Sequence, residues 1–184
     1  MKKILMIAIN SSWSQSNPAL YYLREVIADL SYQSYIKEWT LKDQLKDMLY
    51  WIYSQNAEVI CFSAYIWNRI YLQELIPELI KLLPGAVIVI GGPEAENLSY
   101  LHKERVYLIT GAGEGKFRFL AENNFCVTEE ELIQAEHIPL KDIPFPYRQS
   151  DKEFLKGKLL YYETYRGCPF ACIYCLSAND KRSE

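Results

Sequence analysis

The chain has 184 residues, and its 20 lysines and arginines against 23 aspartates and glutamates give a formal net charge of −3. A chain of this length can form one full domain with part of a second. The near balance of charge argues against binding to a nucleic-acid backbone and against a basic helix on a membrane surface. The first apolar run is too short for a signal peptide, and no stretch approaches the roughly 18 apolar residues of a membrane span. A soluble cytoplasmic protein is therefore expected.

The first part of the chain is predicted to be a strand followed by a helix. Residues 3–9 are a short apolar run that the polar residues 10–17 end. Pro18 suits the first turn of a helix, because the N–H that proline lacks would have no helical partner there. Apolar residues then recur at helical spacing and would form one face of that helix: Leu20, Leu23, Ile27 and Leu30.

The next segments repeat this alternation. Residues 34–40 are predicted to be a strand, and a second amphipathic stretch covers residues 41–52. Residues 58–64 and 86–90 are continuous apolar runs rich in β-branched side chains. Such runs are typical of central strands in a parallel sheet that is covered on both faces.

The helix expected between these two central strands contains a proline. Residues 70–83 have helical spacing, but Pro77 removes a backbone donor, so we expect the helix to kink or restart there. Residues 107–110 are a fifth predicted strand, and residues 114–123 are a helix after it. The side chains that this helix would turn inward are Phe117, Leu120 and Ala121.

Alternating strands and helices over residues 1–125 predict an α/β fold with a Rossmann-like, doubly wound parallel sheet. Three prolines in the sequence IPLKDIPFPYRQS then exclude a regular helix. We therefore expect a first domain at residues 1–138, a linker at 139–157 and the start of a second, truncated domain at 158–184. Residues 158–164 would be a strand that leads directly into a cysteine loop.

Three of the five cysteines stand close together in the sequence RGCPFACIYC. Cys168, Cys172 and Cys175 are spaced so that one tight loop can present three thiolates to one face of a four-iron four-sulfur cluster. Clusters held by cysteine usually have four thiolates, so a set of three leaves one iron open to another ligand. The two remaining cysteines, Cys61 and Cys126, stand alone and are expected to be core or inert residues.

A structural zinc site is the alternative interpretation of this loop. Such a site needs four ligands, often in paired CxxC units, and no fourth ligand lies nearby in the sequence. His102, His137, Cys61 or Cys126 could supply one only through the fold. The spacing, the predicted preceding strand and the aromatic Tyr174 before the last cysteine together favour the cluster.

Ligands of a doubly wound sheet bind beyond the carboxyl ends of its strands. The candidate cofactor-binding residues at this edge are Asn10, Ser11, Ser63, Tyr65, Trp67, Gly91, Gly92, Pro93, Glu94, Gly111, Gly113 and Glu114. Glycines in these loops would let the backbone approach a bulky ligand. A dinucleotide site is the rival, but its GxGxxG pattern follows the first strand of a unit, whereas GAGEG follows the fifth strand here.

Several of these residues also have ordinary structural explanations. Tyr65 and Trp67 can simply pack within their loop. Glu94 and Glu114 can begin helices, where the helix dipole favours a carboxylate.

Four segments together resemble the cobalamin-binding radical S-adenosylmethionine proteins, and most closely an uncharacterised bacterial subgroup: GGPEA, GAGEG, IPFPY and RGCPFACIYC. The resemblance spans the whole chain. It implies a cobalamin-binding domain of Rossmann-like topology ahead of the first strand and cluster loop of a (β/α) barrel. Tyr174 matches the family's aromatic position near the adenine, and Arg166 and Gly167 match the lead-in to the loop.

The resemblance implies three cofactors, namely a 4Fe-4S cluster, S-adenosylmethionine bound to its open iron, and cobalamin. It implies an enzyme that cleaves S-adenosylmethionine reductively for methyl transfer or another radical transformation. Flavodoxin or ferredoxin would be a suitable electron donor. This chain would be the N-terminal part of that enzyme and is not expected to be active alone. The substrate is not readable from the sequence.

One departure concerns cobalt. The DxHxxG signature of corrinoid proteins that ligate cobalt through histidine is absent, since the loop after the first strand is NSSWSQSN. Loop backbone at Gly91, Gly92, Gly111 and Gly113 would then have to hold the corrin, so a side chain added at Gly92 should weaken binding. The alternative function is a non-catalytic Rossmann-like binding module with a structural metal site.

Overall fold

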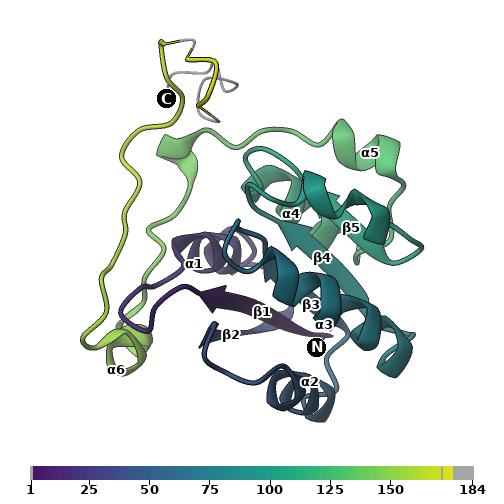
Figure 1. Cartoon of the computed structure of the whole chain (residues 1–184). Coiled ribbons are helices and arrows are strands. Elements are labelled where there is room, and N and C mark those ends of the chain that lie inside the picture. Colours follow the sequence, from purple (N-terminus) through teal and green to yellow (C-terminus); the bar gives the residue numbers. More distant parts are fainter. Residues whose placement is uncertain (1, 171, 176–184) are drawn as a thin grey trace.

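Five parallel strands form the centre of the fold, in the order β2-β1-β3-β4-β5 (Figure 1). The computed structural model describes residues 2–170 and 172–175. The strands are β1 (Lys2–Asn10), β2 (Tyr32–Thr40), β3 (Val59–Ser63), β4 (Val87–Gly91) and β5 (Val106–Ile109). The chain places β2 on one side of β1 and β3 on the other side. The direction in which strands are added to the sheet therefore reverses at β1. The predicted doubly wound α/β sheet is confirmed, with a switch point next to β1.

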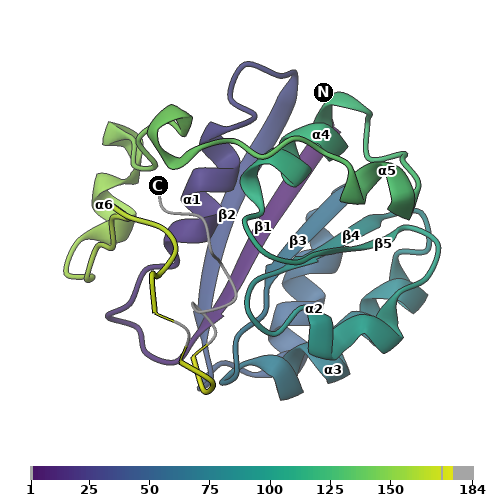
Figure 2. The same cartoon turned by 90° about the horizontal axis from the view of Figure 1, so that it is seen from above.

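Helices cover both faces of this sheet (Figures 1 and 2). One face carries α1 (Pro18–Glu25) and α4 (Glu114–Glu122), and the other carries α2 (Leu45–Ser54) and α3 (Arg69–Leu82). Alternate side chains of β1 enter two separate apolar clusters, Leu5, Ile7 and Ile9 in one and Ile4, Met6 and Ala8 in the other. This explains why β1 is apolar without interruption. Among the residues that the structure describes, no helix has the length and apolar content needed to cross a bilayer.

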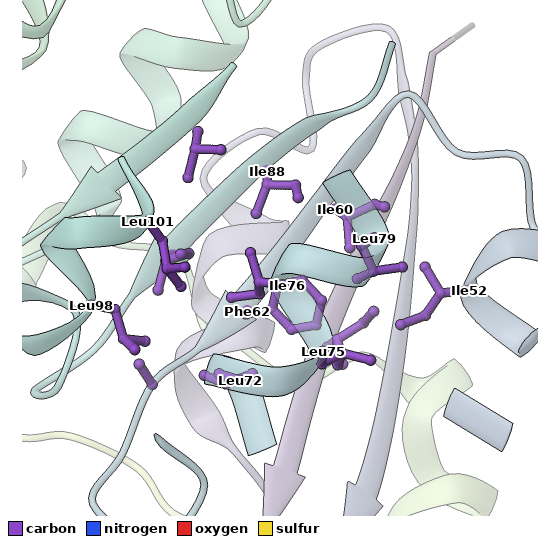
Figure 3. Packing of buried hydrophobic residues seen from close by; sticks show 14 of the residues in the cluster. Ile52, Ile60, Phe62, Leu72, Leu75, Ile76, Leu79, Ile88, Leu98 and Leu101 are labelled. Atoms are coloured by element: carbon purple, nitrogen blue, oxygen red, sulfur yellow. The ribbon is translucent and has the colours of Figure 1, made fainter. Parts of the chain in front are cut away.

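The core beneath α3 is shown in Figure 3. Ile60 and Phe62 of β3 belong to one buried cluster with four α3 side chains: Leu72, Leu75, Ile76 and Leu79. The helix continues through Pro77 from Arg69 to Leu82, so of the two expected outcomes, a kink or a restart, the restart does not occur. Burial of this apolar face offsets the cost of a proline inside a helix, which is about 3 kcal/mol.

Other connections differ from the prediction. The crossover from β4 to β5 is a 3-10 helix, η1 (Glu96–Leu101), with Leu98 and Leu101 in the core. Beyond residue 123, where the periodicity ends, α5 (Glu129–Ile133) begins with a capping box of Thr128 and Glu131. The remaining short helices are η2 (Leu140–Asp142), η3 (Gln149–Asp151) and α6 (Lys152–Leu155).

The stretch predicted to be a strand over residues 158–164 is not a regular strand. It makes one isolated parallel bridge, between Gln15 and Leu159. A strand needs a neighbour along its length to pair its backbone groups, and the described chain provides one only at this point. We call residues 158–167 the strap. It leaves α6 and runs past α1 toward the cysteine loop (Figure 1).

The predicted linker packs against α1. Arg24 donates hydrogen bonds to both carboxylate oxygens of Asp151, at 2.6 and 2.7 Å, and one to the carbonyl of Pro146 at 3.0 Å. Burial disfavours the ionised form of Asp151, but hydrogen bonds from Arg24 and from the Arg148 backbone outweigh it and hold the pKa of Asp151 below its usual value.

Acid is expected to weaken this contact. Because the pKa of Asp151 is lower in the folded chain, its stabilising contribution is complete above the unfolded pKa of about 3.9 and is lost as pH falls through the folded pKa. The variant Asp151→Asn should therefore show a flatter dependence of urea-unfolding stability on pH below about pH 4. The same acid dependence in the variant and the unaltered chain would contradict this expectation.

Candidate functional site

A pocket of about 350 Å³ opens at the carboxyl edge of the sheet, between α1, the start of α4 and the ends of three strands. Ala19, Leu20 and Leu23 of α1 form one wall. The strands β3, β4 and β5 contribute Cys61, Ser63, Val89 and Ile109. A pocket of this size and apolar character is typical of small-molecule sites, which usually range over roughly 300–1,000 Å³.

Most of the residues predicted at this edge line the pocket: Ser63, Tyr65, Gly91, Gly92, Pro93, Gly111, Gly113 and Glu114. They come together because β3, β4 and β5 are adjacent and parallel, so the loops that follow these strands meet at one edge. The pocket lies on the α1 and α4 side of the sheet, away from α2 and α3.

Four predicted residues do not line the pocket: Asn10, Ser11, Trp67 and Glu94. Asn10 and Ser11 both bond to Gln15, at 3.0 and 2.6 Å, and so fix the shape of the loop after β1. Glu94 accepts a hydrogen bond from Arg69 at 2.9 Å, which ties the loop after β4 to the first turn of α3. These contacts are structural.

Trp67 reaches the pocket indirectly. Its ring stacks on Tyr65, with centroids 4.5 Å apart and planes inclined by 6°, and its indole N–H donates to the carbonyl of Ile9 at 3.2 Å. Tyr65 itself lines the pocket. Burial raises the pKa of Tyr65, so its hydroxyl stays protonated. The stacked pair therefore extends the pocket wall with neutral, flat surface.

The pocket floor is neutral as well. Cys61 is 2% exposed, and burial raises the pKa of its thiol well above the usual range. A protonated thiol is a poor metal ligand. Ser63 accepts a hydrogen bond at its Oγ from the buried amide of Asn17 at 2.9 Å, which leaves the Ser63 hydroxyl proton free to donate.

The glycines of the pocket rim differ in whether the fold could accept a side chain at their positions. Gly92 has φ of +102°, and a Cβ there would lie 2.6 Å from the Ala64 carbonyl oxygen. Its small size is therefore required by the fold, and the weaker binding expected of a Gly92 variant would be confounded by misfolding. Gly91 and Gly113 could accept a Cβ without a severe clash, since the nearest atoms would be 3.8 and 3.4 Å away.

An ion pair joins the strap to the pocket rim. Arg166 donates to both carboxylate oxygens of Glu114, at 3.0 and 2.5 Å, and also binds Glu163 at 2.7 Å. Burial disfavours the charge on Arg166, but the hydrogen bonds to both carboxylates outweigh it and raise the pKa of Arg166. All three side chains line the pocket. Glu114 thus binds Arg166, and Arg166 lies two residues before Cys168, the first cysteine of the loop.

The structure places the cysteine loop at the end of the strap without gathering its thiols. Cys168 and Cys175 are half-buried, Cys172 and Tyr174 are exposed, and the Cys175 N–H donates to the Cys172 carbonyl at 3.0 Å. Within residues 2–170 and 172–175, no three metal-ligating side chains are grouped closely enough to hold an ion. Thiolates repel one another, and metal binding is usually what draws such ligands together.

Sequence reasoning missed several pocket residues. It does not single out Glu163 or the α1 side chains, and it gives no binding role to Cys61, which is buried in the core as expected and also lines the pocket floor. The place of Cys61 near the carboxyl end of a central strand was an available signal. No sequence signal connects Glu114 with Arg166, because 52 positions separate them and only the fold brings them together.

No protein-family model matches the sequence, and no curated protein matches it either. Solved structures with a similar fold include the cobalamin-dependent S-adenosylmethionine radical enzyme OxsB, with a TM-score of 0.70, 13% identity and 95% of this chain covered. Another is the radical S-adenosylmethionine methyltransferase TsrM from Kitasatospora setae, whose structure holds a tryptophan substrate and an S-adenosylmethionine analogue. For TsrM the TM-score is 0.55, the identity is 18%, and 66% of this chain is covered.

This chain spans about a quarter of the length of these enzymes, covering 28% of OxsB and 25% of TsrM. At such low identity the likeness establishes the fold. The chain therefore has an α/β fold that also occurs within a cobalamin-dependent radical enzyme and within a radical methyltransferase.

Proposed function

We propose that this chain is the N-terminal part of a cobalamin-dependent radical S-adenosylmethionine enzyme. In this proposal the sheet binds cobalamin, and Cys168, Cys172 and Cys175 hold a 4Fe-4S cluster. The observation that carries it is the bidentate pair of Arg166 and Glu114, which brings the lead-in of the cysteine loop to the pocket rim. Two cofactor sites would then face each other. The fold shared with OxsB and TsrM supports this arrangement.

The pocket fits one part of cobalamin. About 350 Å³ of mostly apolar space suits a planar nucleotide base, whereas the larger corrin ring would lie outside, on the glycine-lined rim. A Cβ built on Gly111 meets nothing within 4 Å, so the rim is open there. The Ser63 hydroxyl could donate to a ring nitrogen of the base, because its oxygen already accepts from Asn17.

The residues that line the pocket offer cobalt no histidine. His102 and His137 are the two histidines of the chain, and neither lines the pocket. The Cys61 thiol is protonated. We therefore propose that cobalamin is held by its base and by loop backbone, with no protein nitrogen on cobalt.

The proposed cluster and the domain division follow the sequence. Residues 1–138 would bind cobalamin, 139–157 would connect the domains, and 158–184 would begin the radical domain. When bound, the cluster would supply the electron that cleaves S-adenosylmethionine, for methyl transfer or another radical transformation. An electron donor such as flavodoxin or ferredoxin would deliver that electron. The exposed Tyr174 would pack near the adenine of the cofactor.

Cobalamin binding is the direct test. Titration of the chain with hydroxocobalamin, followed by visible absorbance, should show saturable binding. The variant Gly91→Val should weaken it about tenfold or more, which corresponds to about 1.4 kcal/mol, because Gly91 lines the pocket and the larger side chain would take up space there. The matched control is Gly85→Val, where a Cβ meets nothing within 4 Å and which lies away from the pocket. Absence of binding at high micromolar cobalamin would favour a non-catalytic binding module instead.

Electron paramagnetic resonance tests how cobalt is held. Free cob(II)alamin carries its own base nitrogen on cobalt, which splits the signal. If the base enters the pocket and no histidine replaces it, the complex should lose this nitrogen splitting. A retained splitting would contradict the assignment of the pocket to the base.

A further inference from the structure

The strap is anchored to the sheet domain at both of its ends. At the first end, the Lys158 ammonium lies 2.6 Å from Glu38 of β2, and these side chains are only 6% and 1% exposed. At the second end, Arg166 binds Glu114 at the start of α4, with side chains 11% and 9% exposed. Between them, the Glu163 N–H donates to the Tyr22 hydroxyl at 3.2 Å. The strap therefore crosses the carboxyl edge of the sheet from β2 to α4.

The pair at the second end is the more directional one. Two parallel N–H to oxygen bonds fix the plane of a guanidinium as well as its position, and ionised partners make such bonds roughly twice as strong as neutral ones. Glu114 is the first residue of α4, where a negative charge is also favoured by the helix dipole. Arg166 is thus held in one orientation relative to the pocket.

Glu163 cannot replace Glu114 in this role. It binds the same guanidinium, at 2.7 Å, but it belongs to the strap itself and lies three residues before Arg166. Its bond orients the Arg166 side chain along the strap without connecting the strap to α4. Its side chain is also 40% exposed, so its contribution is weaker.

We propose that Arg166 is a positioning residue: its bidentate pair with Glu114 sets where the cysteine loop leaves the sheet domain, and so sets the distance between the cluster and the cofactor in the pocket. This rests on the proposed function. Both oxygens of Glu114 serve this contact, so the role assigned to Glu114 here is to hold Arg166 in place.

The first test needs no cofactor. Trypsin must take the Arg166 side chain into its own specificity pocket, so cleavage of the bond from Arg166 to Gly167 reports how often the pair opens. In the variant Glu114→Gln, this cleavage, followed by mass spectrometry, should be on the order of tenfold faster. The matched control Glu163→Gln removes the other carboxylate from the same arginine and should be cut at nearly the rate of the unaltered chain. Equal rates in all three proteins would overturn the proposal.

The second test measures the geometry. With reduced cluster and cob(II)alamin both bound, the magnetic interaction between the two spins reports their separation. Glu114→Gln should weaken or broaden this interaction in samples matched for iron content and bound cobalamin, and Glu163→Gln should preserve it under the same matching. Arg166→Lys keeps the charge but cannot make two parallel bonds, so an intermediate result is expected. An unchanged interaction in Glu114→Gln would overturn the positioning role.

The two tests separate this inference from the function on which it rests. If the unaltered chain binds no cobalamin or no cluster, the proposed function fails and the positioning role fails with it. The trypsin comparison would still show whether the pair docks the strap.

Discussion

Replacing any one of Cys168, Cys172 and Cys175 with alanine is expected to abolish iron binding. Anaerobic reconstitution of the unaltered chain should give a brown protein with about four irons, the stoichiometry of a 4Fe-4S cluster. Three thiolates are the fewest that leave a single open iron, so the loss of one exposes two irons to solvent and the cluster is not retained. Iron content and visible absorbance are the measurements.

The matched control is Cys126→Ala. Cys126 is exposed and lies outside the cysteine loop, so its removal should leave the iron content unchanged. A colourless protein that holds one zinc after the same treatment would contradict the cluster and favour the structural metal site. Iron loss in the Cys126 variant would mean that the loop is not the sole source of ligands.

The variant Gly92→Ala is expected to destabilise the fold by on the order of 3 kcal/mol, as the sum of backbone strain and overpacking. The new Cβ would meet backbone atoms of Ala64, at 2.6 Å from the carbonyl oxygen and 3.1 Å from the nitrogen. These atoms cannot move freely, because Ala64 donates to Gly91 at 2.7 Å and accepts from Glu94 at 3.1 Å. Urea unfolding measures the change.

The comparison variant is Gly113→Ala, also in a pocket loop. Its φ is −92°, and the nearest atom to the new Cβ would be the Ile109 Cγ2 at 3.4 Å, at the end of a side chain. Little loss of stability is expected. If Gly92→Ala were as stable as Gly113→Ala, the close approach of the two loop backbones would not be a constraint on the fold.

Periodicity predicted the sheet well because each central strand buries both faces. Residues 58–64 and 86–90 are largely apolar, and the structure forms β3 at Val59–Ser63 and β4 at Val87–Gly91. Failures occurred where local signals compete with packing. Pro77 is tolerated because α3 is held by its buried face, and η1 is too short to show a helical period.

The part of the candidate site that is formed by the ends of the strands could be predicted from the sequence. The loops after β4 and β5 converge because those strands are neighbours, and topology alone predicts such a meeting. The contact of Arg166 with Glu114 was not predictable, since it depends on the path of a strap that has no regular structure. The spacing of the cysteines also does not predict whether their thiols come together, because metal binding is usually what gathers such ligands.

The buried pair of Lys158 and Glu38 restricts how this sequence can diverge. Substituting either residue alone would leave one charge in a nearly water-free environment, which costs far more than losing the pair as a whole. Glu38 also accepts the Asn17 backbone N–H at 2.9 Å, and the Lys158 ammonium lies 4.1 Å from the centre of the Phe154 ring. We therefore expect positions 38 and 158 to vary together among relatives, as a matched ion pair or as two apolar residues.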